Sequence, residues 1–377
     1  MLVTIRTEEL KNAINKIFNI PPKGENEHGI HSHFVFDIGD KNFISAYGKN
    51  CYAVVPLTIM SMKAPFRFSV NAKKLKDFID LSEDEAVNIS YEPAGSLVCV
   101  ELDGKAKTNI YLQSLSLDSF PNFHKNFVGA ESLYHIWMQD FIDPLKISML
   151  YLDDNLNRYN FAEFKDGYFR SGHGRKFLLA KTKDVFTTPL LVPKDVIANC
   201  LNFFKGINAE SIEVKKEAGN IFLKVSEYEY FGYPLTVDKS FPEDVVKMLL
   251  GLTVGKTFDV SKDHLEKLLN RTKIAAEDIV NKSMLKFYKG GFDMITTSNK
   301  GLPLNQKDNG INWEYEPYTC HFNHSDLISA VKSMEGDVIR LTLFFKENGT
   351  PEVYKIEGMK DGASCGKSAF LTFYESV

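Results

Sequence analysis

The feature that most constrains the fold of this chain is a weak internal repeat, which occurs three times along its 377 residues. Each copy opens with a short strand pattern followed by an amphipathic helix pattern, at residues 3–17, 134–145 and 257–269. In the first copy, Leu10, Ile14 and Ile17 have the three- and four-residue spacing of a helix with one buried face. Landmarks that return in a fixed order indicate one structural unit used several times.

Three further landmarks define the unit. A hairpin follows the first helix, with its turn at Gly39-Asp40-Lys41, Lys165-Asp166-Gly167 and Lys289-Gly290-Gly291. A strand then leads into a second helix, at residues 70–79, 192–198 and 322–331. The first two copies close on Phe120-Pro121 and Phe241-Pro242.

This order predicts an α+β fold with mostly antiparallel sheet, because hairpins connect the strands. Each domain then contains two units of strand, helix and further strands. The predicted domains are 1–128, 129–253 and 254–377. The alternative is three unrelated domains that share common hairpins by chance.

Composition excludes several classes of protein. The chain is 44% hydrophobic and 25% charged, as folded proteins are. No apolar run approaches the ~18 residues of a membrane helix, and charge appears too early for a signal peptide. The scattered cysteines indicate a reducing cytoplasm, without a disulfide framework or zinc ribbon: Cys51, Cys99, Cys200, Cys320 and Cys365.

The net charge is −4 and is spread evenly, with no basic tail. A protein that holds nucleic acid by bulk charge alone usually has a basic excess. Any contact with DNA must therefore come from a sorted surface that is basic on one face and acidic elsewhere.

Two motifs resemble catalytic or metal-binding sites but lack the residues that such sites require. Gly362-Ala363-Ser364-Cys365-Gly366 fits a nucleophile elbow, yet no histidine follows it and the residues after it have a strand pattern. His28, His31 and His33 have ligand-like spacing without an acidic or thiol partner, which is typical of a surface loop. We expect no catalytic residue, no metal and no cofactor.

A nucleotide-dependent enzyme stays open as the alternative function. Gly255-Lys256-Thr257 and Gly366-Lys367-Ser368 each end like a phosphate-binding loop. The glycine that should begin each loop stands one residue too close, at Gly251 and Gly362. Loss of ATP binding after Lys256→Ala or Lys367→Ala would favour this alternative.

The ordered landmarks resemble the bacterial DNA polymerase III sliding clamp (beta subunit) family, of which the chain looks like a divergent member. The most specific stretches are 68–121, 158–177 and 191–242. The resemblance implies a non-catalytic processivity factor in which two chains join head to tail as a ring around duplex DNA. Sheets would lie outside and helices would line the channel. Its partners would be double-stranded DNA, a polymerase, a clamp loader and other proteins with clamp-binding motifs. A clamp-fold scaffold that does not bind DNA is a further alternative.

The resemblance also implies two sets of site residues. The DNA-contacting residues would be Lys23, Lys73, Lys74, Arg158 and Lys194. The partner-peptide pocket would contain Gly174, Arg175, Lys176, Phe177, Pro242, Val246, Lys247, Leu371, Phe373 and Tyr374. The sequence departs from the family pattern in two places. Asp153 and Asp154 would repel phosphate beside Arg158, and the C-terminal tail differs from that of the family.

Overall fold

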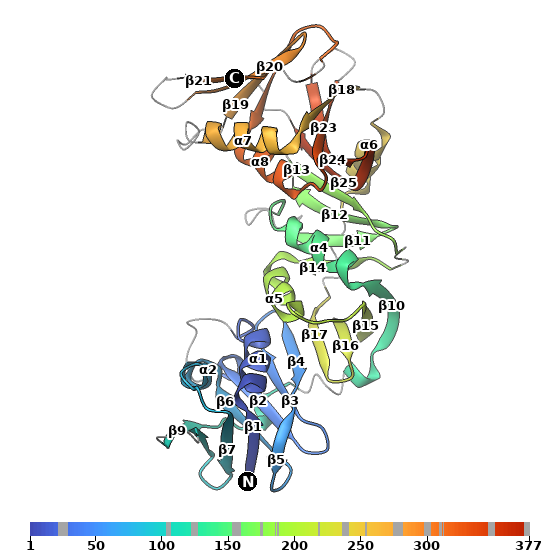
Figure 1. Cartoon of the computed structure of the whole chain (residues 1–377). Helices are drawn as coiled ribbons and strands as arrows, with labels where there is room; N and C mark the ends of the chain where they lie inside the picture. Colours follow the sequence, from blue (N-terminus) through green and yellow to red (C-terminus); the bar gives the residue numbers. More distant parts are fainter. Residues whose placement is uncertain are drawn as a thin grey trace. The chain divides into compact units, whose positions relative to one another are not determined.

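The computed structural model is drawn in Figure 1. It describes residues 1–21, 29–102, 107–121, 127–152, 160–173, 176–184, 186, 188–217, 219–235, 241–252, 255–273, 282–297, 303–308, 311, 313–345 and 351–372. Contacts divide the chain into two compact units: Met1–Asp143 with Val192–Val237, and Pro144–Leu191 with Asp238–Val377. The predicted domain boundaries near residues 128 and 253 stay a prediction. One eight-stranded sheet contains strands from both sides of residue 128, and the other contains strands from both sides of residue 253.

The first unit contains two sheets. The five-stranded sheet has the order β5 (Ile59–Met62), β1 (Leu2–Arg6), β7 (Ala86–Glu92), β8 (Leu97–Leu102) and β9 (Thr108–Gln113). The eight-stranded sheet has the order β10 (Glu131–Trp137), β15 (Ser211–Glu217), β16 (Asn220–Ser226), β17 (Glu229–Pro234), β4 (Tyr52–Pro56), β3 (Phe43–Tyr47), β2 (His33–Ile38) and β6 (Phe66–Asn71). Antiparallel pairing of β17 with β4 joins segments about 180 residues apart in the sequence into one sheet.

Helices α1 (Thr7–Ile17), α2 (Ala72–Asp80) and α5 (Lys194–Phe204) belong to this unit. α1 contacts both other helices and strands β1, β3 and β4. Its buried face contains Leu10, Ile14 and Ile17, as the spacing predicts. Two 3₁₀ turns, Ile30–Ser32 and Leu117–Ser119, also belong to the unit, and helix α4 (Met138–Ser148) has residues in both units.

The second unit repeats this plan. Its eight-stranded sheet has the order β14 (Leu190–Pro193), β11 (Phe161–Lys165), β12 (Tyr168–His173), β13 (Lys176–Lys181), β25 (Ala363–Thr372), β24 (Pro351–Lys360), β23 (Val338–Phe345) and β18 (Gly255–Ser261). Its four-stranded sheet has the order β21 (Pro303–Asp308), β20 (Gly291–Thr297), β19 (Lys282–Tyr288) and β22 (Tyr318–Asn323). Helices α7 (Lys262–Lys273) and α8 (His324–Ser333) pack side by side, while α6 (Glu243–Gly251) lies apart from them (Figure 1).

The three predicted hairpins are confirmed as β2–β3, β11–β12 and β19–β20. The β11–β12 turn shows why its residues suit the position. Asp166 and Gly167 have φ angles of 52° and 78°, a conformation that Asp tolerates and Gly adopts freely. The α+β class predicted from the landmarks is therefore confirmed by the strands and helices of both units.

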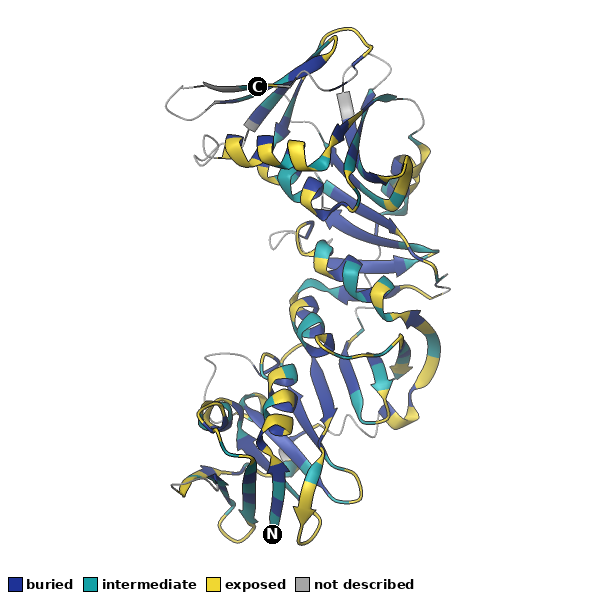
Figure 2. Cartoon of the chain, viewed as in Figure 1, coloured by how far each residue is buried: buried dark blue, intermediate teal, exposed yellow. Residues whose placement is uncertain are grey.

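The helices of both units are amphipathic, with their exposed residues on the side away from the sheets (Figure 2). α2 buries Ala72, Leu75 and Ile79, and leaves Lys73 and Lys74 exposed. None of the helices among the described residues is long and apolar enough to span a membrane.

Candidate functional site

An apolar cluster on one face of the eight-stranded sheet of the second unit gathers part of the predicted peptide pocket. Strands β11 and β13 contribute Phe161, Phe177 and Leu179, and α6 contributes Val246 and Leu249. Further members are Leu191, Phe241, Val353 and Phe370, with Val245 and Leu252 packed around them. The alternation of side chains along a strand explains the grouping, since Phe177 and Leu179 point to the same face of β13.

Phe241 anchors the segment that leads into α6. Its ring packs edge-on against Phe161 and Phe177, with centroid separations of 6.5 and 6.0 Å. Val246 and Leu249 are three residues apart in α6, so they point to the same side of the helix and into the cluster. Met248 and Leu250 of α6 stay exposed. The helix therefore packs its apolar side onto the sheet and leaves two large apolar side chains exposed.

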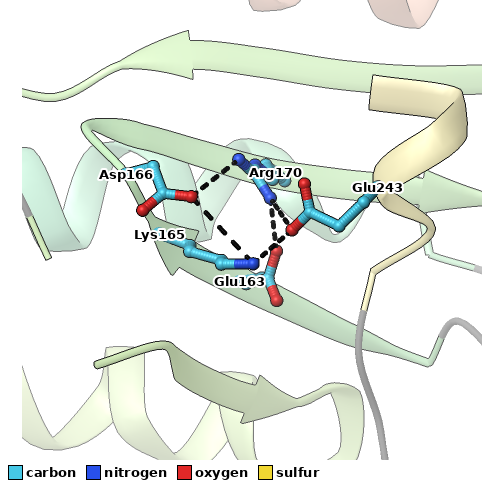
Figure 3. A network of polar contacts seen from close by, with 5 residues as sticks. All are labelled: Glu163, Lys165, Asp166, Arg170 and Glu243. Carbon is cyan, nitrogen blue, oxygen red and sulfur yellow. Dashed lines mark hydrogen bonds and ion pairs between the residues drawn. The ribbon is translucent and has the colours of Figure 1, made fainter. Parts of the chain in front are cut away.

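Figure 3 shows a network of charged side chains on β11, β12 and the start of α6, and β11 and α6 also contribute residues to the cluster. Glu163 and Arg170 are directly opposed in the β11–β12 hairpin, and both are almost wholly buried. Arg170 Nη1 donates to Glu163 Oε2 at 3.1 Å and to Glu243 Oε1, on the first residue of α6, at 2.9 Å. Lys165 donates to the same carboxylate oxygen of Glu243. Asp166 completes the network, 3.8 Å from Arg170 Nη2.

The pKa values of these groups reflect their positions. Burial raises the pKa of Glu163, although the charge of Arg170 and a hydrogen bond from the backbone of Phe241 act in the opposite direction. The hydrogen bond from Lys165 lowers the pKa of Glu243, with a smaller contribution from Arg170. The same hydrogen bond raises the pKa of Lys165. Glu243 is therefore held as a carboxylate between two cations.

The predicted pocket residues do not all reach the cluster. Phe177 and Val246 belong to it, and Pro242 precedes α6. Lys247 is exposed, and Lys176 instead pairs with Asp326 at 3.0 Å. Leu371 is buried next to Phe370 in β25, but Phe370 is the residue in the cluster. Gly174, Arg175, Phe373 and Tyr374 lie outside the described residues.

Three of the predicted DNA-contacting residues lie on helices. Lys73 and Lys74 are exposed on α2, where Lys73 also pairs with Asp77 at 2.9 Å. Lys194 is half-buried at the start of α5. Lys23 and Arg158 lie outside the described residues.

The two near-miss nucleotide loops are strands. Lys256 lies in β18, fully paired with β23, and its ammonium group is 5.1–5.9 Å from the ring centroids of Tyr315, Tyr318 and Phe345. Lys367 lies in β25 and pairs with Glu335. A phosphate-binding loop needs a turn followed by a helix, so neither segment has the required geometry.

The remaining motifs are likewise structural. Ser364 lies in strand β25, which continues after Gly366 as predicted, and the Ser364 hydroxyl faces Glu357. The surface-loop prediction is wrong for His33, which is buried at the start of strand β2 with its Nδ1 3.1 Å from the Gly29 carbonyl oxygen, whereas His31 is exposed. His28 lies outside the described residues. Within the described parts of the chain, no group of three His, Cys, Asp or Glu residues could hold a metal ion.

Among known proteins, similarity is found at the level of structure and not of sequence. No family model and no curated protein matches the sequence. The structure, however, is similar over its whole length to the DNA polymerase III beta subunit of Thermotoga maritima, with 16% identity and a TM-score of 0.82. It is equally similar to the beta subunit of Pseudomonas aeruginosa and the sliding clamp of Caulobacter crescentus, each with 14% identity and a TM-score of 0.84. Each match covers 100% of both chains.

The chain has the sliding-clamp fold. The match extends from end to end, so the predicted α+β clamp fold is confirmed, while the division into three domains stays a prediction. At these low identities the likeness establishes the fold alone.

Sequence reasoning missed helix α6 and the charged network. A signal for the helix is present, because Pro242 precedes Glu243 and Asp244, and Val246 and Leu249 follow at helical spacing. The network had no such signal. Glu163 and Arg170 become cross-strand neighbours only through the register of the hairpin, and Glu243 is far from both in the sequence.

Proposed function

We propose that this protein is a DNA polymerase processivity factor, a sliding clamp that encircles duplex DNA and tethers a polymerase. The observation that supports this most directly is the end-to-end similarity to beta subunits and sliding clamps. The charge distribution fits, because a ring that holds DNA by topology needs only weak, sequence-independent phosphate contacts. The five free cysteines fit a reducing cytoplasm.

Lysines on the helices would supply those phosphate contacts. Lys73 and Lys74 extend from the exposed face of α2, and Lys194 begins α5. Lys23 and Arg158 complete the proposed set of DNA-contacting residues. The ion pair of Lys73 with Asp77 is exposed, so Lys73 could exchange Asp77 for a phosphate at little cost, because exposed ion pairs contribute at most about 1 kcal/mol.

The apolar cluster around α6 would be the core of the site that binds partner peptides. Its members are aromatic and aliphatic side chains buried between α6 and the sheet, and the exposed Met248 and Leu250 of α6 provide apolar surface beside it. Such a surface fits short hydrophobic segments of a polymerase or clamp loader. Gly174, Arg175, Lys176, Phe373 and Tyr374 are the proposed outer residues of this site.

Assembly into a ring would use open sheet edges. β9 is the last strand of the five-stranded sheet, and β21 is the last strand of the four-stranded sheet. The first lies early in the sequence and the second lies late, as a head-to-tail contact between two copies requires. Such strands offer unpaired backbone groups to a second chain.

Topological retention on DNA tests the proposal. The protein is incubated with a clamp loader, ATP and nicked circular plasmid, and the DNA is then isolated by gel filtration in high salt. We expect the protein to stay with the circle and to leave once a restriction enzyme linearises the plasmid. Processive extension of a primer by a polymerase should depend on the same loading step.

The two alternatives predict different results. Release from the intact circle in high salt would show surface binding and contradict encirclement. A scaffold that does not bind DNA would remain unbound under every condition. ATP binding by the protein without the loader would support a nucleotide-dependent enzyme, and the strand geometry of Lys256 and Lys367 predicts none.

A further inference from the structure

We propose that Arg170 fastens helix α6 to the β11–β12 hairpin through Glu163 and Glu243, and that this fastening positions the α6 wall of the peptide site. The fastening is inferred from the contacts of Arg170 alone. Its effect on peptide binding rests on the proposed function. Arg170 would touch no ligand. It is a positioning residue that acts through Val246 and Leu249.

The network holds the start of α6 at two points. Glu163 accepts a hydrogen bond from the backbone of Phe241, two residues before the helix. Glu243, the first residue of the helix, binds Arg170 and Lys165 with its side chain. Because Arg170 binds both carboxylates through the same nitrogen, it couples the entry of the helix directly to the hairpin.

The rest of α6 has only apolar attachments to the sheet. Asp244 and Lys247, the other charged residues of the helix, form no ion pair with the residues that the structure describes. Contacts of Val246 and Leu249 are non-directional, since apolar burial depends on area and not on angle. The direction of the helix is therefore set at its N-terminal end, by charged hydrogen bonds.

The composition of the network favours positioning over stabilisation. The side chains of Arg170 and Glu163 are 4% and 2% exposed, so both pay a large desolvation cost. The buried Nε of Arg170 has no hydrogen-bond partner among the described residues. Buried ion pairs of this kind often add little stability over apolar side chains, whereas their directional bonds specify one arrangement.

Two variants and one matched control test the proposal. Glu243→Gln keeps the size of the side chain and removes its charge. Because the Glu243 side chain is partly exposed, we expect this variant to fold. Asp244→Asn removes the same charge from the adjacent, exposed position of the same helical turn. Glu163→Gln with Arg170→Met neutralises the buried pair together, so neither charge is left buried without its partner.

The first measurement is hydrogen exchange of the α6 amides in the full-length protein. We expect exchange to be about tenfold faster in Glu243→Gln and in the double variant, because a charge-assisted hydrogen bond corresponds to about that factor in an opening equilibrium. Asp244→Asn should exchange at the wild-type rate. Wild-type exchange in both network variants would overturn the fastening.

The second measurement is the affinity for a fluorescein-labelled pentapeptide with leucine and phenylalanine side chains, a probe chosen to suit the apolar cluster. Binding should weaken about tenfold in Glu243→Gln and stay unchanged in Asp244→Asn, while both variants unfold at the same urea concentration. Equal peptide affinity in the two variants would overturn the positioning role. A wild-type protein that binds no peptide would contradict the proposed pocket, and hydrogen exchange would still decide the fastening.

Discussion

At the scale of single residues, His324 connects three elements of the second unit inside the protein. Its Nε2 donates to the Leu269 carbonyl oxygen of α7 at 2.8 Å, and its Nδ1 lies 3.3 Å from the Ser283 hydroxyl of β19. Burial lowers the pKa of His324, and the charge of Lys273 adds to this. The folded protein therefore keeps a neutral imidazole that the unfolded chain would protonate near pH 6.5.

We expect the unfolding free energy to decrease as the pH falls from about 7.5 to 5.5, because the unfolded state binds the proton that the folded state resists. At pH values above the ordinary pKa of histidine, the stabilising contribution of the neutral His324 side chain is fully present. His324→Gln should be less stable at pH 7.5 and should lose most of the pH dependence. Urea unfolding at the two pH values measures both effects. The exposed His264→Gln is the control, and an equal loss of pH dependence there would contradict the assignment.

At the scale of elements, α2 illustrates how one helix serves both packing and charge. Its apolar residues face the core, and Asn71 caps its N-terminus by accepting from the backbone N–H of Lys74 at 3.0 Å. We expect Lys73→Glu with Lys74→Glu to shorten retention on circular DNA and to reduce the salt slope of DNA binding by about 2, since each phosphate contact contributes about 0.9. Binding measured at several salt concentrations gives the slope.

Lys63→Glu is the matched control for this prediction. Lys63 is also exposed, but it follows strand β5 and its backbone N–H donates to Leu2 of β1. It should leave the salt slope unchanged. An unaltered slope in the α2 variant would remove Lys73 and Lys74 from the proposed DNA contacts.

At the scale of the whole molecule, a ring of two copies predicts a particle of about twice 42.8 kDa. Sedimentation at equilibrium measures this mass directly. Tyr111 is 61% exposed on the edge strand β9, so Tyr111→Glu should place a charge in a strand-to-strand contact and shift the particle toward the monomer. The exposed Leu81→Glu, at the end of α2, should leave the mass unchanged. A stable wild-type monomer would contradict the ring.

Sequence reasoning reached the fold because its signals are local and repeated. Helical spacing located the buried face of α1, and turns such as Asp166-Gly167 marked the hairpins. The apolar cluster beside α6 was only partly predictable. Phe177 and Val246 were identified, whereas Lys176 turned out to pair with Asp326, and Phe370 was overlooked beside Leu371. Side-chain direction along a strand depends on register, which single residues do not reveal.

What the sequence determined by itself is the recurring order of strands, helices and turns, because each follows from the spacing of nearby residues. Only the tertiary structure decided that β4 pairs with β17 and β13 with β25, which joins distant segments into continuous sheets. It also decided that Arg170 lies between Glu163 and Glu243. Such contacts depend on the register and packing of elements that are far apart in the chain. The hydrophobic pattern of a strand or helix determines which of its faces is buried, but not which side chains meet there.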